Sequence, residues 1–599
     1  MTALDNTIQP ETGVKVGLPR ADEWIMTSTH SPAPPKTSPS RPSLPVVVPK
    51  AAPAAARVLR AAVWLLPAVL VAAAGFRRRW MSDDAFIYVR TVRQVLAGNG
   101  PVFNPGERVE SSTGTLWQWL LVAAGAVGAD PASAAVYGGL ALTGVGFALA
   151  GLGALRVYGG RAAVPVGSLL LLGLPPVWDF ATSGLETGLL TCWIAGAWLA
   201  LVARPGALAT SVLCGLGPLV RPDLGLVSVV FLGAQWLLVR PSWRGVLAGA
   251  GAAGALPGAY EVFRAGYYGH LVPLPAVTKE ASRSLWGRGF GYVVDLALPY
   301  LLWVPALFVV AAVLFGRGGR PPERGGPLVP VFAPVVAGLL CWLYVVKVGG
   351  DFMHGRMLLP GLLLLLLPVF VVPVSRVGVC AAVGVGAWAV VCAGWLRVPY
   401  EGHIGPAGIA DERGVYVRHN ADPHPVHHDF AGAPYHRGYL QDVRAAARSG
   451  APTLLFGGGG PRTAANSPSV TSSYVVLGLN GSVVPLAGAA LDPIGLAYPL
   501  AAHSERIEGG RVAHDKWLPN AWLAADRGLP SDPPPGVDPA QIDAARRALR
   551  CGALAELRAA TRDPLTPGRF LRNVTGAWER TSFRFPNDPV VAERELCGR

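Results

Sequence analysis

Two adjacent carboxylates stand directly after a hydrophobic segment of the sequence. Asp83 and Asp84 follow an apolar run at residues 58–76, which is long enough to cross a bilayer and is succeeded by three arginines. Neighbouring carboxylates repel each other, and placing them near hydrocarbon is costly unless a cation, a metal ion or a bound hydroxyl compensates them. The pair is therefore the first candidate for catalysis, and a solvated loop is the alternative.

Other polar segments carry the residue types that a sugar phosphate would need. Carboxylates can hold a hydroxyl, cations a phosphate and aromatic rings a sugar face, which suits transfer from a lipid-phosphate sugar. A transporter would instead place ionisable groups at mid-span and show internal repeats, and the sequence has neither feature. The candidate phosphate-binding residues are Arg221, Lys279 and Arg356, and the candidate substrate-binding residues in the same part of the chain are Glu110, Glu186, His270, Asp351 and His354.

Composition indicates a polytopic membrane protein. Of 599 residues, 51% are hydrophobic and 15% are charged, against about 25% charged in soluble domains, and the mean hydropathy is +0.39. The net charge of +14 comes without a basic helix, a zinc-finger spacing or an RNA-binding motif. Anionic lipids or lipid phosphates therefore fit this charge better than a nucleic acid does.

The apolar runs predict about eleven membrane-spanning helices. If the N-terminus is cytoplasmic, the short arginine-rich loops also face the cytoplasm, and an odd number of spans puts everything after residue 397 outside. The run at 207–220 is short for a span, and the later loops change sides if it does not cross. A further apolar stretch at 113–128 is interpreted as a surface-lying or re-entrant helix. The predicted spans are 58–76, 134–155, 163–178, 186–203, 207–220, 223–240, 245–262, 296–315, 327–347, 356–375 and 378–396.

Three parts are predicted along the chain. Residues 1–56, rich in Pro, Ser and Thr, are expected to be a disordered cytoplasmic tail. Residues 57–396 form the transmembrane domain, with a first outer loop at 77–132. Residues 397–599 regain a soluble frequency of charged residues and predict an extracytoplasmic α/β or β-rich domain.

The exported domain contains two short apolar runs, at 453–456 and 474–477, that predict buried strands. Its two cysteines, Cys551 and Cys597, are expected to form a disulfide outside the cell. We expect this domain to bind the acceptor glycan and to contribute little to donor binding, because it offers aromatic and hydrogen-bonding side chains that suit sugars. The expected exposed residues are Tyr498, His503, His514, Lys516 and Trp517, although a core position for Trp517 is equally open.

Two weaker motifs lie in the same domain. Four histidines and two aspartates close together could hold a metal ion, although loop histidines are more often solvated. A run of four glycines at 457–460 lacks the ending of a nucleotide-binding P-loop. The residues of the histidine group are His419, Asp422, His424, His427, His428 and Asp429.

Four stretches resemble GT-C glycosyltransferases, which are polytopic enzymes that use polyprenyl-phosphate sugars. Within that class they are most similar to the terminal β-(1→2) arabinofuranosyltransferases of mycobacterial-type cell walls. The resemblance extends from the first loop into the exported domain and leaves out the long N-terminus. The stretches are Ser82 to Glu110, Ser183-Gly-Leu-Glu-Thr187, Gly349 to Pro360, and Leu491 to His503 with His514-Asp-Lys516.

The resemblance implies a substrate pair and a location. The donor would be decaprenylphosphoryl-arabinofuranose, and the acceptor would be an arabinan end in arabinogalactan or a lipoarabinomannan-type glycan, at the outer face of the plasma membrane. A mannosyl or aminosugar transferase of the same architecture is one alternative. A non-enzymatic transporter or envelope scaffold is the other.

The expected chemistry uses one carboxylate and at least one cation. Asp83 or Asp84 would act as a base on the acceptor hydroxyl, and the cations would stabilise the leaving phosphate. A simple base suits inversion, whereas the resemblance implies a β product from a β donor, so a carboxylate could instead stabilise an oxocarbenium ion or change roles. No cofactor is firmly expected, but a divalent cation (Mg²⁺, Mn²⁺ or Ca²⁺) held by the same pair is an open alternative.

Overall fold

The computed structural model describes seven stretches of the chain, and residues 54–599 form one structural unit. The predicted boundary at 396/397 therefore stays a prediction. Most of the expected disordered tail at 1–56 lies outside the described residues, as do 427–429 of the histidine group and 458–460 of the glycine run. The described stretches are 54–280, 283–316, 328–426, 434–457, 462–467, 469–511 and 513–598.

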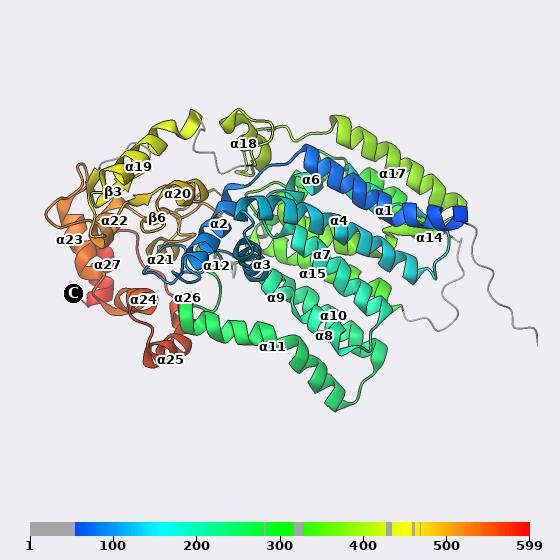
Figure 1. Cartoon of the computed structure of the whole chain (residues 1–599), viewed down its shortest axis with the longest axis horizontal. Helices are drawn as coiled ribbons and strands as arrows, with labels where there is room; N and C mark the ends of the chain where they lie inside the picture. Colours follow the sequence, from blue (N-terminus) through cyan, green and yellow to red (C-terminus); the bar gives the residue numbers. More distant parts are fainter. Residues whose placement is uncertain are drawn as a thin grey trace, which may run out of the picture. The chain divides into compact units, whose positions relative to one another are not determined.

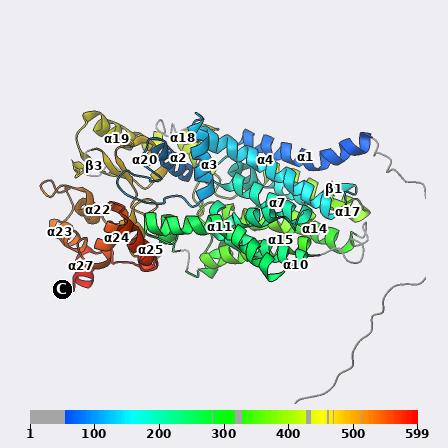
Figure 2. The same cartoon turned by 60° about the horizontal axis from the view of Figure 1, so that its bottom comes forward.

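The first part of the unit is built from apolar helices, which lie roughly side by side in both views (Figures 1 and 2). Among the described residues, five helical segments are long and apolar enough to cross a membrane. The chain is therefore a helical membrane protein, while the number of eleven spans stays a prediction. The five segments are α4 (Pro131–Val157), η1 with α10 (Pro222–Val239), α11 (Trp243–Tyr268), α15 (Val329–Val348) and α17 (Arg376–Trp395).

Several predicted spans are broken where proline and glycine interrupt the apolar run. Proline removes a backbone donor and clashes with the preceding turn, so a helix cannot continue unchanged through it. The run at 163–178 is β1, α5 and α6, the run at 207–220 is α8 and α9, and the run at 356–375 is η3, α16, η4 and β2. The run at 163–178 is therefore not one helix, whereas Leu208–Val220 and Arg356–Val369 are apolar helical segments shorter than 18 residues, and whether these runs cross a membrane stays a prediction.

The remaining elements of this part are mostly short helices. A helix is present in the stretch 113–128 as α3, while its surface-lying or re-entrant position stays a prediction. The elements are α1 (Ala54–Arg77), α2 (Asp83–Leu96), α3 (Thr115–Ala126), β1 (Ala163–Pro165), α5 (Gly167–Gly173), α6 (Pro175–Ala181), α7 (Thr187–Ala203), α8 (Leu208–Gly215), α9 (Gly217–Val220), η1 (Pro222–Leu224), α10 (Gly225–Val239), α12 (Leu274–Thr278), α13 (Trp286–Ala297), α14 (Trp303–Phe315), η3 (Arg356–Leu358), α16 (Leu359–Leu366), η4 (Leu367–Val369) and β2 (Val371–Pro373).

The C-terminal part surrounds a small mixed sheet with helices. The strand order is β4-β3-β5-β6, with β3 antiparallel to β4 and parallel to β5, and β5 parallel to β6. The elements are α18 (Glu412–Asn420), η6 (Pro434–His436), α19 (Arg437–Ser449), β3 (Thr453–Phe456), β4 (Arg462–Ala464), β5 (Thr471–Ser473), α20 (Leu477–Val483), β6 (Ala489–Leu491), α21 (Pro499–His503), α22 (Asn520–Arg527), α23 (Pro539–Ala548), α24 (Gly552–Arg562), α25 (Pro567–Thr575), α26 (Ala577–Ser582) and α27 (Pro589–Cys597).

Two of the three local predictions for this part are confirmed. The predicted strand at 453–456 is β3, and Cys551 and Cys597 form a disulfide between the start of α24 and the end of α27. The predicted strand at 474–477 is wrong, because β5 ends at Ser473 and α20 begins at Leu477. Leu477 is instead buried in the core, Tyr474 and Val476 pack against it, and Val475 is exposed.

Candidate functional site

The start of α2 fixes the two adjacent carboxylates in different surroundings. The backbone N–H of Ser82 donates to the carbonyl of Ser183, so the helix begins next to the Ser183–Thr187 motif. Asp83 then turns toward the C-terminal part of the chain, whereas Asp84 lines a cavity.

Asp83 is buried and bonded to the backbone of another helix. Its Oδ2 and Oδ1 accept the N–H groups of Gly478 (2.9 Å) and Leu479 (2.7 Å) at the start of α20. Burial raises the pKa of Asp83 to about 7, with the Asp84 charge adding to this effect and the two backbone donors opposing it. The sequence suggested a pair at the outer surface, and the structure shows that its first member is a buried contact between α2 and α20.

The other end of α20 is held by a guanidinium from the same helix α2. Arg90 Nη1 donates to the carbonyls of Gly481 (2.9 Å) and Val484 (2.7 Å), and Nη2 donates to Pro485 (3.2 Å) and Gly488 (2.9 Å). A carboxylate at the N-terminus and a cation at the C-terminus both complement the partial charges of a helix. We call Asp83 and Arg90 the α20 clamp.

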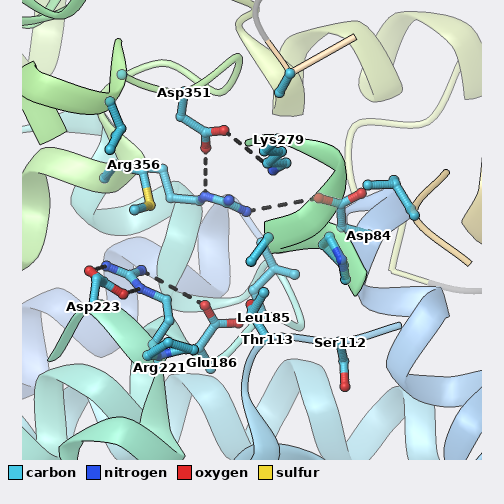
Figure 3. A pocket seen from close by; sticks show the side chains of 18 of the residues that line it. Asp84, Ser112, Thr113, Leu185, Glu186, Arg221, Asp223, Lys279, Asp351 and Arg356 are labelled. Atoms are coloured by element: carbon cyan, nitrogen blue, oxygen red, sulfur yellow. Dashed lines mark hydrogen bonds and ion pairs between the residues drawn. The ribbon is translucent and has the colours of Figure 1, made fainter. Parts of the chain in front are cut away.

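Asp84 lies in a cavity of about 180 Å³ opposite two cations (Figure 3). Its Oδ2 is 4.0 Å from Arg356 Nη1, while Asp351 lies 2.9 Å from Arg356 and 3.8 Å from Lys279 Nζ. Burial raises the pKa of Asp84, and the positive charges of Lys279 and Arg356 oppose that rise. A carboxylate whose pKa is shifted by burial and by nearby charges is typical of a site where a proton is taken up or released.

A second group of charges lines the same cavity. Arg221 Nε donates to Asp223 Oδ1 (2.6 Å), and Arg221 Nη1 lies 3.8 Å from Glu186 Oε1. The hydroxyl of Tyr88, from α2, donates to Glu186 Oε2 (3.0 Å) and fixes that carboxylate. The loops before α7 and α10 and the first outer loop thus meet at one cavity (Figure 3).

Several polar atoms at this cavity are buried without a hydrogen-bond partner in the described part of the chain. They are Arg221 Nη1, Asp351 Oδ2 and Arg356 Nε. The last two are 2.9 Å apart as an ion pair, but they are not aligned for a hydrogen bond. Since nearly all buried polar groups in proteins are satisfied, such a cluster indicates a place where a polar ligand binds.

Residues of the C-terminal part also line the cavity. Arg506 and Asp515, which pair with each other, come from the segment between α21 and α22. The cavity lining carries five carboxylates and five cations, so their formal charges balance when all are ionised. This shared lining does not support the expected separation of a donor site from an acceptor domain. The charged lining residues are Asp84, Glu186, Asp223, Asp351, Asp515, Arg221, Lys279, Arg288, Arg356 and Arg506.

Other predicted site residues lie away from this cavity. Glu110 pairs with Arg264 of α11 (2.6 Å) and accepts from Tyr260 (2.9 Å), so it ties the first outer loop to a membrane helix. His354 Nδ1 lies 2.6 Å from Asp295 Oδ2, on the lining of a smaller cavity of about 30 Å³.

The histidines and lysine expected to contact glycan are mostly internal. His270 and His503 are buried with their Nε2 atoms 3.0 Å apart, and burial lowers the pKa of His270 to about 4. Lys516 donates to the carbonyl of Ala502 (2.7 Å) and pairs with Glu280 (3.3 Å). These contacts join the two parts of the unit.

The predicted exposure of several residues was therefore wrong. Tyr498, His503 and Lys516 are each at most 1% exposed, because packing and hydrogen bonds inside the unit already use their polar groups. His514 is partly buried with its ring 4.8 Å from that of Phe352, and Trp517 is 50% exposed. Of this group, Trp517 is available at the surface.

Sequence reasoning missed one buried acid near the carboxylate pair. Glu412, at the start of α18, accepts from Ser82 Oγ (3.2 Å) and lines the cavity that contains His354. Burial raises the pKa of Glu412 to about 8, and the charges of Asp84 and Asp83 add to the rise. No motif marks Glu412, because it is 330 residues from its partner in the chain.

No group of three or more His, Cys, Asp or Glu side chains arranged to hold a metal occurs within the described ranges. His427, His428 and Asp429 of the histidine motif lie outside those ranges. A divalent cation at Asp83 and Asp84 stays a prediction, although Asp83 already accepts two backbone hydrogen bonds.

Two curated proteins named terminal beta-(1->2)-arabinofuranosyltransferase are similar to the chain over most of its length. The Mycobacterium tuberculosis protein is 35% identical over 634 aligned residues, covering 90% of this chain and 98% of that protein. The Corynebacterium glutamicum protein is 35% identical over 570 residues, covering 84% of this chain and 82% of that protein. A family model described as the AftB family C-terminal domain matches residues 459–593.

One solved structure is also similar in outline. The crystal structure of ArnT from Cupriavidus metallidurans bound to undecaprenyl phosphate covers 91% of this chain and 78% of that chain, at 14% identity and a TM-score of 0.35. A TM-score this low does not establish a common fold.

Proposed function

The chain belongs to the terminal β-(1→2)-arabinofuranosyltransferases of mycobacterial-type cell walls, and we propose that its donor is decaprenylphosphoryl-arabinose. The enzyme is a glycosyltransferase, and its acceptor in this proposal is an arabinan end of the arabinogalactan or lipoarabinomannan type. Transfer takes place at the outer face of the plasma membrane, with the N-terminus cytoplasmic and the C-terminal part outside.

The cavity that holds Asp84 is the observation that supports this proposal most directly. Lys279 and Arg356 stand opposite Asp84, and three buried polar atoms there make ion pairs but no hydrogen bond among the described residues. A phosphate can be bound by the two cations while the carboxylate receives a hydroxyl proton. The apolar share of the lining, which includes Ile87 and Leu185, suits a lipid-linked donor.

In the proposed reaction, the bond between the anomeric carbon and the phosphate oxygen breaks. The cations Lys279 and Arg356 stabilise the negative charge that accumulates on the departing polyprenyl phosphate. A glycosidic bond forms between the anomeric carbon and the acceptor oxygen, and the proton of that hydroxyl passes to Asp84. The raised pKa of Asp84 brings its proton affinity nearer to the working pH than that of an exposed aspartate.

The stereochemical course distinguishes two roles for the carboxylates. A single displacement assisted by Asp84 inverts the anomeric centre. A β product from a β donor requires a second displacement, or an oxocarbenium ion that is attacked from the side the phosphate has left. Glu186 and Asp351 line the same cavity and are the candidates for a second carboxylate.

The decisive experiment is a transfer assay with purified protein. Labelled decaprenylphosphoryl-arabinose and an oligoarabinoside acceptor should give a product extended by a terminal β-(1→2)-linked arabinofuranosyl residue, as determined by linkage analysis. Polyprenylphosphoryl-mannose serves as the matched donor control and should give no product. Transfer of mannose instead of arabinose, or a different linkage, would reject the proposed donor or product.

A further inference from the structure

Two of the most exposed large apolar side chains of the C-terminal part lie on α25 and α26. Leu571 is 64% exposed and Trp578 is 72% exposed, and Leu565 just before α25 is also exposed. The opposite face of α25 is buried through Arg569 and Asn573. On α25 the exposed side carries Leu571 between polar residues such as Arg572 and Thr575, and on α26 Trp578 is exposed beside Glu579. Within the described part of the chain, the two helices therefore present large apolar side chains next to charged ones, as helices at a membrane surface do.

Both α25 and α26 are fixed to the end of the membrane helix α11. Asn573 Nδ2 donates to the carbonyl of Gly266 in α11 (2.9 Å), and Arg580 Nε donates to the carbonyl of Gly269 (2.9 Å). Phe570 packs so closely on α11 that a Cβ at Gly266 would lie 2.1 Å from its ring. Both views place α25 at that end of α11 (Figures 1 and 2).

The length of α11 gives the depth of this contact. The helix begins at Trp243, which is 68% exposed, as is typical of a tryptophan at a membrane boundary. Gly266 is 23 residues farther on, which is about 35 Å of helical rise, and Pro257 inside α11 makes the end-to-end distance somewhat shorter. The hydrocarbon thickness of a bilayer is about 30 Å. Gly266 therefore lies near the far end of the bilayer crossing that α11 is long enough to make, just beyond the predicted span at 245–262.

The surface of α11 between those boundaries is open to lipid. Just 11% of its apolar window is buried, and Leu247, Leu256 and Val262 are exposed. The helices α25 and α26 contact this helix at Gly266 and Gly269, at the end of its open surface. Arg572, which is exposed beside Leu571, supplies a cation at the height of the lipid phosphates.

We propose that α25 and α26 form a membrane-surface contact of the C-terminal part, with Leu565, Leu571 and Trp578 in the interfacial region of the bilayer. The occupant of this face is lipid, because α25 and α26 are attached to the end of α11, whose mostly uncovered apolar surface is long enough for a bilayer crossing. The contact holds the C-terminal part at a fixed height above the membrane, in addition to its contacts with the ends of the helices.

The contact can be measured with a fluorescent label in nanodiscs that hold one copy of the full chain. Leu571→Cys is labelled with an NBD maleimide in discs of phosphatidylcholine and phosphatidylglycerol, with and without lipid that carries a doxyl quencher near the headgroup. Asp543→Cys is the matched control, because it is exposed on α23, at the far edge of the C-terminal part in both views. Native cysteines are replaced by Ser, except for the disulfide pair.

We expect the doxyl lipid to lower the NBD emission at position 571 about twofold or more and to leave position 543 unchanged, since the quencher acts within the interface. Equal emission with and without the quencher at position 571 would overturn the proposal. A blue-shifted but unquenched label would also overturn it, because the face would then be covered by protein. Trp578→Cys is labelled in parallel, so that the test does not depend on one variant folding.

Discussion

At the residue scale, the two carboxylates at the start of α2 lie in different surroundings. Asp83 accepts two backbone hydrogen bonds from α20, whereas Asp84 faces Arg356 and Lys279 across a cavity. The adjacent charges alone suggested one shared function for the pair. The difference arises because consecutive residues at a helix start point in directions about 100° apart.

Replacing Asp84 with Asn should lower transfer by about 10² to 10⁴, the usual contribution of a general base. Donor binding should stay close to normal, because Arg356 and Lys279 remain. The comparison is Asp83→Asn, which replaces one acceptor oxygen with a donor facing the N–H groups of Gly478 and Leu479 and should cost about 1 to 3 kcal/mol of stability. The measurements are single-turnover transfer and thermal unfolding of both variants.

The opposite pattern would reverse this assignment. An Asp84→Asn enzyme with normal turnover, beside an inactive Asp83→Asn enzyme with an unchanged melting temperature, would make Asp83 the catalytic carboxylate.

Glu412 should make the folded state more stable at low pH than at high pH. Burial keeps the pKa of Glu412 at about 8, while the unfolded chain releases that proton near 4.5. The folded state therefore binds more protons between these values, and the free energy of unfolding falls as the pH rises through this window. Glu412→Gln should weaken the dependence of the melting temperature on pH between 5 and 8.

The control for this measurement is Glu401→Gln, since the Glu401 carboxylate is 59% exposed. The wild-type pH dependence should persist in that variant. If Glu412→Gln also retains it, a different group causes the dependence.

Several site residues were predictable from the sequence because they share local motifs. Asp84, Glu186, Asp351 and Arg356 lie in stretches that resemble a known family, and the structure brings them to one cavity. The importance of Glu412 was not predictable, because only its burial in the folded structure distinguishes it from other acidic residues. The expected exposure of Lys516 failed for the same reason, since a sequence does not reveal which polar side chains are satisfied internally.

At the element scale, α2 and α20 depend on a close backbone approach. A Cβ at Gly478 would lie 1.9 Å from the carbonyl oxygen of Asp83, which is far inside van der Waals contact. Gly478→Ala should therefore push the two helices apart and weaken the hydrogen bonds of the Asp83 carboxylate.

We expect Gly478→Ala to lower the melting temperature clearly and to reduce transfer, because Asp84 follows Asp83 on the displaced helix. Gly438→Ala is the control, since a Cβ at this helical glycine of α19 meets no atom within 4 Å. It should be neutral or slightly stabilising, because alanine favours a helix over glycine by about 1 kcal/mol. Equal melting temperatures for both variants would show that the helices tolerate the change.

Element types were predictable where one signal dominated. The apolar run at 453–456 is flanked by turn-forming residues and forms β3. The run at 474–477 is similarly apolar, yet Tyr474 stacks on Tyr439 with ring centroids 3.8 Å apart, and α20 starts three residues later. The conformation of residues 474–477 is therefore set by tertiary packing and does not follow from their strand propensity.

At the scale of the whole molecule, the loops at the two ends of the helices should face opposite sides of the membrane. Gly206 lies between α7 and α8, away from the Glu186 end of α7, and Gly438 lies in α19 of the C-terminal part. A Cβ at either glycine meets no atom within 4 Å, so a cysteine should be tolerated at both positions.

An impermeant maleimide applied to intact cells should label Gly438→Cys and should label Gly206→Cys only after permeabilisation, because the positive-inside rule places the arginine-rich loops in the cytoplasm. The unmodified protein gives the background from native cysteines. Equal labelling of both variants in intact cells would mean that the orientation inferred from the loops is incorrect.

The membrane character and the family were predictable, because composition and motifs are local properties of the chain. The contacts that join the helical part to the C-terminal part were not predictable. Glu110, His270 and Lys516 have the residue types of a binding site, but in the structure they connect segments that are distant in sequence. Residue type alone does not separate these two uses.

The α20 clamp has a consequence for biosynthesis. Arg90 and its acceptors at Gly481 to Gly488 are separated by 391 to 398 residues, so α2 leaves the ribosome long before its partner helix exists. At about 5 to 20 residues per second, this interval is about 20 to 80 s. Throughout that time, the buried guanidinium and its apolar neighbours are uncovered on the nascent chain. Cellular chaperones and proteases therefore meet an unfinished first loop in every molecule, and an interrupted chain displays it permanently.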